Sequence, residues 1–149
     1  MQLINRTIVI TGASSGLGEA LARTLHKEGA NLILVARRED RLQTLASELQ
    51  ADYLVYDLEQ APEVLAQTLS DRYKQIDVLV NNAGFGEFSF LEDTSIETIE
   101  SMHRINVLSP VRLTKACLPL LKEGGMIVNV ASQAGKLPTP KSTIYCMTK

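Results

Sequence analysis

The sequence predicts an α/β protein, with one largely parallel β-sheet covered by helices on both faces. Five short runs rich in valine, isoleucine and leucine alternate with longer segments whose apolar residues recur at helical spacing. This alternation is typical of βαβ units, because a parallel strand is reached only through a crossover connection. A glycine-rich turn directly after the first run supports the same fold class. The 149 residues contain no linker, repeat or low-complexity tract, so we expect one domain over residues 1–149.

The expected strands are runs of four to six residues that are apolar almost throughout. They cover residues 7–11, 31–36, 53–56, 77–81 and 126–130. Continuous apolar runs, rather than strict alternation, are typical of strands that are buried on both faces of a sheet.

The first three expected helices lie between these strands. Apolar residues at helical spacing mark segments 17–28 and 38–49, and Gly29 supplies a C-terminal stop for the first of them. Pro62 opens the third helix, because proline fits the first turn, and this helix is expected to end at about residue 73.

A longer helical region is expected between the fourth and fifth strands. Either Thr94 or Ser95 caps its beginning. Two prolines, Pro110 and Pro119, are expected to break or bend it before a Gly-Gly pair at 124–125 leads into the last strand.

The overall composition argues against several kinds of partner. Fifteen basic residues against 17 acidic ones give a formal net charge of −2, which offers no electrostatic footprint for nucleic acid and no polybasic membrane anchor. No apolar stretch approaches the roughly 18 residues that span a bilayer, and the N-terminus has no signal-peptide pattern. Cys117 and Cys146 form no cluster with each other or with histidine, so no metal site is predicted. We therefore expect a cytoplasmic protein.

The glycine-rich turn, Thr11-Gly-Ala-Ser-Ser-Gly-Leu-Gly18, joins the first strand to the first helix. A helix N-terminus holds a diphosphate with its free N–H groups where no Cβ blocks the approach. Gly12 would allow the tight exit from the strand, Gly16 the close approach of the backbone, and Gly18 the packing of helix on sheet. Such glycines also occur in turns that merely join two elements, but their place at the start of a βαβ unit favours nucleotide binding.

The second strand ends in Ala36-Arg37-Arg38, where an NAD-specific domain usually presents a carboxylate to the ribose hydroxyls. A guanidinium group there pairs bidentately with a 2′-phosphate. The pattern favours NADP over NAD, with Arg37 as the first candidate and Arg38 as the second. The alternative is that both arginines are solvated residues that open a helix.

A second group of candidate catalytic residues lies near the end of the chain. Ser132 follows the fifth strand, Tyr145 comes thirteen residues later and Lys149 four residues after that. If a helix begins at Tyr145, Lys149 lies on the same face one turn away, where its ammonium group favours the phenolate form. A Tyr-x-x-x-Lys spacing alone is a common accident. After a dinucleotide-type turn and a strand-end serine, it predicts an acid/base pair, with Ser132 holding a substrate oxygen.

Together these pieces resemble the short-chain dehydrogenase/reductase family, in the family's order and spacing over the whole chain. The matching pieces are the glycine turn 11–18, Asp57-Leu58, Asn81-Asn-Ala-Gly84, Asn106, Ser132 and Tyr145-Cys-Met-Thr-Lys149. The resemblance implies a Rossmann-type doubly wound parallel sheet with strand order 3-2-1-4-5.

The resemblance also implies catalytic roles. Tyr145 would be the general acid/base, and Lys149 would support it and hold the nicotinamide ribose. Ser132 would orient the substrate oxygen, and Asn106 would support a water-linked proton relay through a backbone carbonyl.

For the cofactor, the resemblance implies that Asp57 binds the adenine amine and that Asn82 and Ala83 line the adenosine ribose. From the residues alone, Asp57 remains a possible cap for the next helix, and segment 81–84 a stabiliser of the sheet edge. The expected cofactor-binding residues are Gly12, Ser14, Ser15, Gly16, Leu17, Gly18, Arg37, Arg38, Asp57, Leu58, Asn82, Ala83, Gly84, Tyr145 and Lys149.

The implied activity is NADP(H)-dependent hydride transfer between the nicotinamide and a small ketone or secondary alcohol. One alternative is a non-catalytic nucleotide-binding or interaction module. Another is epimerase or dehydratase chemistry with tightly held NAD, against which Arg37, Arg38 and the thirteen-residue Ser132–Tyr145 spacing argue.

Members of that family continue beyond the position of Lys149 with two further strands, a Pro-Gly turn at the nicotinamide and a lid over the substrate. We therefore expect an N-terminal part of a single NAD(P)-binding domain, complete for adenosine and incomplete for nicotinamide and substrate. The resemblance further implies a homodimer or homotetramer for the full-length form. In that assembly the helix that begins at Tyr145 would pack with the one carrying Asn106 across the dimer interface. Because only one turn of it is present here, we expect an apolar strip on Leu108, Val111, Leu113 and Leu118 to lose part of its cover.

Overall fold

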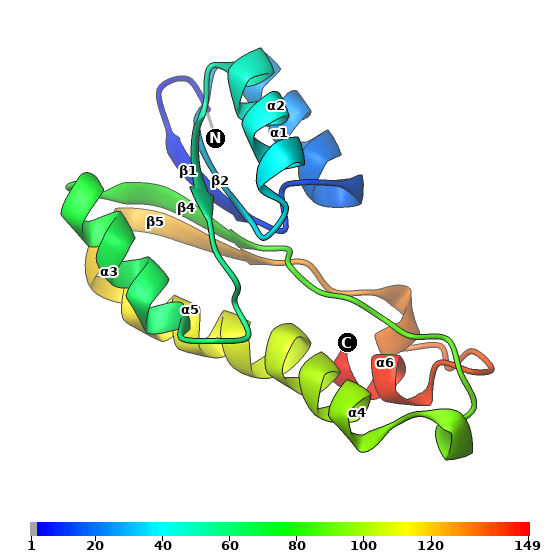
Figure 1. Ribbon diagram of the computed structural model, residues 1–149. Coiled ribbons are helices and arrows are strands. Elements are labelled where there is room, and N and C mark those ends of the chain that lie inside the picture. Colours follow the sequence, from blue (N-terminus) through cyan, green and yellow to red (C-terminus); the bar gives the residue numbers. More distant parts are fainter. Residues whose placement is uncertain (1–2) are drawn as a thin grey trace.

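The computed structural model describes residues 3–149 and contains a five-stranded sheet of order β3-β2-β1-β4-β5 (Figure 1). All neighbouring strands in it are parallel. The expected fold class and strand order are therefore confirmed, while Met1 and Gln2, the start of the N-terminal stretch, lie outside the described residues. The strands are β1 (Thr7–Thr11), β2 (Asn31–Ala36), β3 (Asp52–Val55), β4 (Ile76–Asn81) and β5 (Leu121–Asn129).

Helices cover the two faces of the sheet in separate layers (Figure 1). Helices α1 (Gly16–Lys27) and α2 (Glu39–Leu49) pack on one face, and α3 (Pro62–Arg72) and α5 (Ser109–Cys117) on the other. The alternation of side chains along β1 shows why both faces need cover, since Ile8 and Ile10 join one core and Val9 the other. All six residues of β4 are buried, as expected for a central parallel strand.

The helical region after β4 differs in detail from the expectation. Ser95, and not Thr94, caps α4 (Ile96–His103), because its side chain accepts a hydrogen bond from the Thr98 amide at 3.1 Å. Helix α4 runs through a π-helical turn, Arg104–Leu108, into α5. Pro110 does not break the region, which continues from the π-helical turn into α5.

Strand β5 begins at Leu121, five residues before the expected start at Met126. Ile76 pairs with Leu121 while Val78 pairs with Met126, so extra residues of β5 bulge out between the two pairs. Gly124 lies in this bulge with φ +73°, a conformation that glycine adopts without strain. Gly124 and Gly125 therefore lie within β5, whereas the sequence had placed them before the strand.

The chain then passes a 3₁₀ turn at Gln133–Gly135 and ends in the short helix α6 (Thr143–Thr148). This helix begins two residues before Tyr145, where the sequence had placed its start. Figure 1 shows α6 beside α4, at the edge of the molecule to which the loops after β4 and β5 extend. Within residues 3–149, none of the helices is both long enough and apolar enough to cross a membrane.

Candidate cofactor and active site

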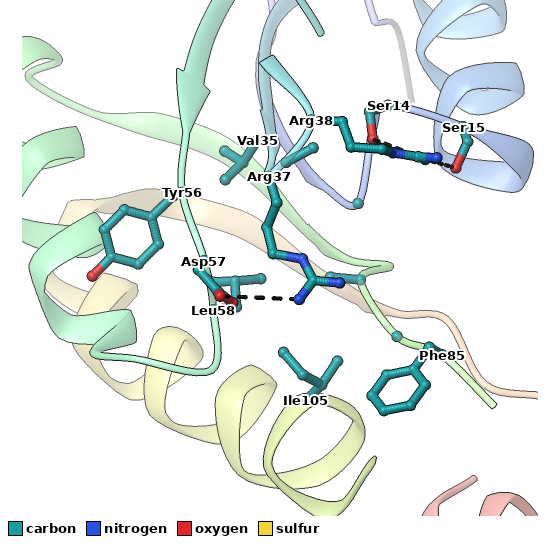
Figure 2. Close-up of a pocket in the computed structure, with 14 residues that line it drawn as sticks. Ser14, Ser15, Val35, Arg37, Arg38, Tyr56, Asp57, Leu58, Phe85 and Ile105 are labelled. Atoms are coloured by element: carbon teal, nitrogen blue, oxygen red, sulfur yellow. Dashed lines mark hydrogen bonds and ion pairs between the residues drawn. The ribbon is translucent and has the colours of Figure 1, made fainter. Parts of the chain in front are cut away.

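A pocket of about 280 Å³ opens at the carboxyl ends of the strands, where β1 and β4 lead the chain in opposite directions (Figure 2). In doubly wound sheets this switch point is the usual place for a nucleotide. Four chain segments that directly follow strands contribute to its wall. The lining residues are Gly12, Ser14, Ser15, Val35, Ala36, Arg37, Arg38, Tyr56, Asp57, Leu58, Ala83, Gly84, Phe85 and Ile105.

The glycine turn lies tightly against the loop that follows β4. A Cβ on Gly12 would come within 2.8 Å of the Ala83 Cα, and one on Gly18 within 2.3 Å of the Gly12 carbonyl oxygen. Gly16 is different, because no atom from outside its own stretch of chain lies within 4 Å of the place a Cβ would take at the start of α1. The turn therefore leaves open space at a helix N-terminus, which fits the backbone approach that a diphosphate needs. The neighbouring Leu17 is exposed.

Thr11 and Asn82 hold this arrangement together. The Asn82 amide group donates to the carbonyl oxygens of Thr11 at 2.9 Å and Gly12 at 3.3 Å. The backbone amides of Asn82 and Ala83 both donate to the Thr11 hydroxyl, at 3.0 and 3.1 Å. Ala83 and Gly84 line the pocket. Asn82 does not line it, and its side chain instead binds the backbone of the glycine turn. The sequence analysis assigned no role to Thr11. A polar threonine at the end of a buried strand could have indicated that its hydroxyl forms hydrogen bonds there.

Asn81 does not line this pocket, and its side chain has a structural role. Its side-chain amide donates to Asn129 Oδ1 at 2.8 Å and to Thr114 Oγ1 at 2.9 Å. These bonds join the end of β4 to β5 and α5. For Asn81, the geometry agrees with the alternative that this segment stabilises the sheet.

The two arginines after β2 have different surroundings (Figure 2). The Arg38 guanidinium group donates to the Ser14 hydroxyl at 3.2 and 3.3 Å and also to the Ser15 hydroxyl. Arg37 points across the pocket, and its Nη1 lies 3.9 Å from carboxylate oxygens of both Asp57 and Glu59. Arg38 is thus the arginine held beside the glycine turn, although the sequence ranked Arg37 first.

Asp57 and Leu58 form the floor of the pocket beside Arg37. The Asp57 carboxylate accepts a hydrogen bond from the Glu59 amide at 3.0 Å, while Ala61 is the N-cap residue of α3. Asp57 therefore does not cap the next helix, which was its structural alternative. Leu58 is buried and, with Ile105, gives the pocket an apolar surface suited to a base.

Asn106 lies in the π-helical turn, a geometry often found at functional sites. Its side chain is fixed by the Phe85 backbone, since it accepts from the Phe85 amide at 3.0 Å and donates to the Phe85 carbonyl at 2.8 Å. It also donates to the Thr148 hydroxyl at 2.8 Å, and this hydroxyl donates to the Tyr145 carbonyl at 2.9 Å. Thr148 therefore links α6 to the π-helical turn, a role that no local pattern indicated.

Tyr145 and Lys149 lie against the same loop. The Lys149 ammonium nitrogen is 5.8 Å from the centre of the Tyr145 ring, and burial lowers the pKa of this lysine. A Cβ on Gly84 would lie 3.0 Å from Lys149 Nζ, and one on Gly86 would lie 2.6 Å from the Tyr145 ring. The structure thus brings Asn106, Tyr145 and Lys149 together around residues 84–86.

Ser132, the remaining catalytic candidate, lies at the start of the 3₁₀ turn after β5. Its hydroxyl oxygen accepts a hydrogen bond from the Ala134 amide at 3.2 Å and so caps the 3₁₀ turn after β5. Over residues 3–149, no hydrogen bond joins Ser132 to Tyr145. The hydroxyl hydrogen of Ser132 remains available as a donor.

A second pocket, of about 400 Å³, lies between the ends of β4 and β5 and helix α5. Asn106, Thr148 and Lys149 contribute to its wall, together with Ala83, which also lines the first pocket. For a metal ion, by contrast, the described part of the chain holds no suitable group of three or more histidine, cysteine or acidic side chains.

Comparison with known proteins agrees with this geometry. The family model described as short chain dehydrogenase matches residues 6–149. An uncharacterized oxidoreductase of Staphylococcus aureus strain MRSA252 is 35% identical over 154 residues, covering 99% of this chain and 67% of the relative. One from Staphylococcus saprophyticus is 38% identical over 152 residues, covering 97% and 62%.

Solved structures give the same result. An alcohol dehydrogenase from the archaeon Thermococcus sibiricus, complexed with 5-hydroxy-NADP, matches with a TM-score of 0.90 and 36% identity, over 96% of this chain and 65% of that one. A short-chain dehydrogenase from Streptomyces avermitilis matches with a TM-score of 0.90 and 33% identity, over 97% and 56%. The chain thus spans 56–67% of the length of these four relatives. From the match over residues 6–149, we conclude that the chain belongs to the short-chain dehydrogenase family.

Proposed function

We propose that the protein containing this chain is an NADP(H)-dependent oxidoreductase acting on a ketone or secondary alcohol. One observation carries the proposal: the nucleotide-type pocket and the acid/base candidates meet at one loop. Residues 83–85 of this loop line the pocket, while Asn106, Lys149 and Tyr145 lie against residues 84–86. A cofactor in the pocket and a substrate beside Tyr145 are then neighbours.

The residues of the pocket fit a dinucleotide. The open space at Gly16 and the N-terminus of α1 suit the diphosphate, and the apolar surface of Leu58 and Ile105 suits the adenine. Asp57 would hold the adenine amine. When bound, the nicotinamide supplies or accepts the hydride.

The side chains of this protein would manage the proton. The Tyr145 hydroxyl would donate a proton to the substrate oxygen during reduction and accept one during oxidation. The Lys149 ammonium group stabilises negative charge on that hydroxyl. Ser132 would donate a hydrogen bond to the substrate oxygen while its own oxygen still accepts from the Ala134 amide.

The preference for NADP over NAD rests on Arg38. Its guanidinium group, with the hydroxyls of Ser14 and Ser15, forms a cluster of donors at the edge of the pocket. Such a cluster suits a 2′-phosphate, for which a planar guanidinium is the preferred partner. The solved relative complexed with 5-hydroxy-NADP supports the same choice. Cytoplasmic location stays a prediction.

The test is oxidation of NADPH by the full-length protein that contains this chain, with a panel of small ketones and aldehydes, followed by absorbance. Tyr145→Phe should abolish turnover, while NADPH binding, measured by calorimetry, is retained. Tyr53→Phe is the matched control, because Tyr53 lies on β3 outside both pockets and should keep full activity. NADPH binding without turnover in any assay would support the alternative, a non-catalytic nucleotide-binding module.

A further inference from the structure

Glu59 does not line the first pocket, the one that would hold the adenosine, but lies next to Asp57 and Leu58, which do. Residues of α4 and of the π-helical turn contact its carboxylate. Its Oε1 accepts a hydrogen bond from the Ser101 hydroxyl at 2.7 Å. Its Oε2 lies 3.7 Å from Nε of Arg104, and its side chain is only 25% exposed. The carboxylate therefore has a fixed position.

From this position Glu59 reaches Arg37. Nη1 of Arg37 lies 3.9 Å from Glu59 Oε1 and 3.9 Å from Asp57 Oδ2. Figure 2 shows the Arg37 side chain extended across the pocket toward Asp57. Arg38, in contrast, has hydroxyl partners, and within residues 3–149 it makes no ion pair with a carboxylate.

We infer that Glu59 is a specificity-determining residue, which limits the preference for NADP by competing with the 2′-phosphate for Arg37. The inference rests on the proposed function. A 2′-phosphate at the end of β2 draws Arg37 toward itself, but Glu59, fixed by Ser101 and Arg104, cannot follow. Arg37 must give up its carboxylate partners in order to bind the phosphate. NADH carries no such phosphate, so it offers Arg37 no anion in exchange for its carboxylate partners.

Asp57 also pairs with Arg37, but it lines the pocket and would contact either cofactor. Glu59 does not line the pocket. Removing its charge therefore changes the competition for Arg37 without removing a cofactor contact. For an ion pair of this length with a largely exposed arginine, the expected gain in affinity is about 1.5- to 5-fold.

The experiment is calorimetric titration of this chain with NADPH and with NADH. Glu59→Gln should tighten NADPH binding by about 1.5- to 5-fold and leave NADH binding unchanged, and the gain should shrink at high salt. The matched control is Glu100→Gln, since Glu100 pairs with Arg104 at 3.2 Å but does not contact Arg37. It should alter neither affinity.

A second pair of variants tests whether Arg37 carries the effect. In an Arg37→Ala background, Glu59→Gln should no longer change the affinity for NADPH. An undiminished gain there would mean direct repulsion of the phosphate and would overturn the inference, as would a gain shared equally by NADH or no gain at all.

The outcomes separate this inference from the proposed function. A clear preference for NADPH that Arg38→Ala removes, together with no effect of Glu59→Gln, overturns the inference alone. If the unaltered chain binds both cofactors alike and Arg38→Ala affects neither selectively, the proposed preference fails, and the inference fails with it.

Discussion

Arg37 and Arg38 are adjacent and chemically identical, yet the fold gives them different partners. Arg38 lies beside the hydroxyls of Ser14 and Ser15, while Arg37 is drawn toward Asp57 and Glu59. Among the described residues, the Arg38 guanidinium has only neutral hydroxyl partners, so it can bind an anion without breaking an ion pair. A guanidinium that is paired with carboxylates must first leave them.

The two arginines should therefore differ when each is removed. We expect Arg38→Ala to weaken NADPH binding by about 10- to 150-fold, the value of one charge-assisted contact to phosphate. Arg37→Ala should cost less, and NADH binding should change little in either variant. Titration calorimetry with both cofactors measures this. An equal loss of NADPH and NADH affinity would show that the arginines act through the fold instead.

At the level of elements, an ion cluster around the buried Asp77 ties three strands together at their amino-terminal ends, away from the site. Asp77 of β4 is 8% exposed and pairs with Arg6, just before β1, at 2.6 Å and with Lys122 of β5. Its second oxygen accepts from the Thr7 amide at 2.9 Å. Burial alone would raise the pKa of Asp77, but the hydrogen bonds from Lys122, Arg6 and the Thr7 amide outweigh it and hold the pKa at about 2.

This lowered pKa predicts a pH-dependent stability. A carboxyl whose folded pKa lies below its unfolded value, 3.8, stabilises the fold fully above that value and loses the contribution as the pH falls toward 2. Asp77→Asn should lower the free energy of unfolding at pH 7 by about 1–2 kcal/mol and flatten the loss of stability between about pH 5 and 2. Denaturant unfolding at several pH values measures both effects. Asp71→Asn, at an exposed site on α3, is the control and should keep the acid dependence of the original chain.

At the level of the whole molecule, an apolar face of the α5 region is left without cover. Leu108, Val111 and Leu118 are 46%, 63% and 54% exposed. Leu113, which the sequence placed in the same strip, is fully buried against the sheet, so that expectation was wrong. The reason is helical geometry, because a residue two positions from Val111 faces the opposite way.

We expect this face to mediate self-association, as the family resemblance implies. Val111→Lys should shift the chain toward monomer, because it places a charge where apolar area would be buried. Sedimentation over a range of concentrations measures the change. Ile4→Lys, at an exposed apolar position near the start of the chain, should leave the association state as it is. A chain that is monomeric at all concentrations would contradict the prediction.

Much of the fold was predictable because its signals are local. The strands at 7–11 and 31–36 were predicted to the residue, since buried parallel strands read as continuous apolar runs. The start of β5 and the π-helical turn were missed. A bulge is set by the partner strand and a π turn by the packing around it, and neither leaves a pattern in the neighbouring residues.

By itself, the sequence determined the fold class, the glycine turn and the spacing of Tyr145 and Lys149. These depend on backbone freedom and side-chain period, which act over a few residues. Only the tertiary structure decided which partners each site residue has. Arg38 meets Ser14 across 24 positions and Asn106 meets Thr148 across 42, while Glu59 faces both Arg37 and Ser101. Such contacts form only when the packing of whole elements brings distant residues within about 3–4 Å, and composition and local pattern carry no record of that distance.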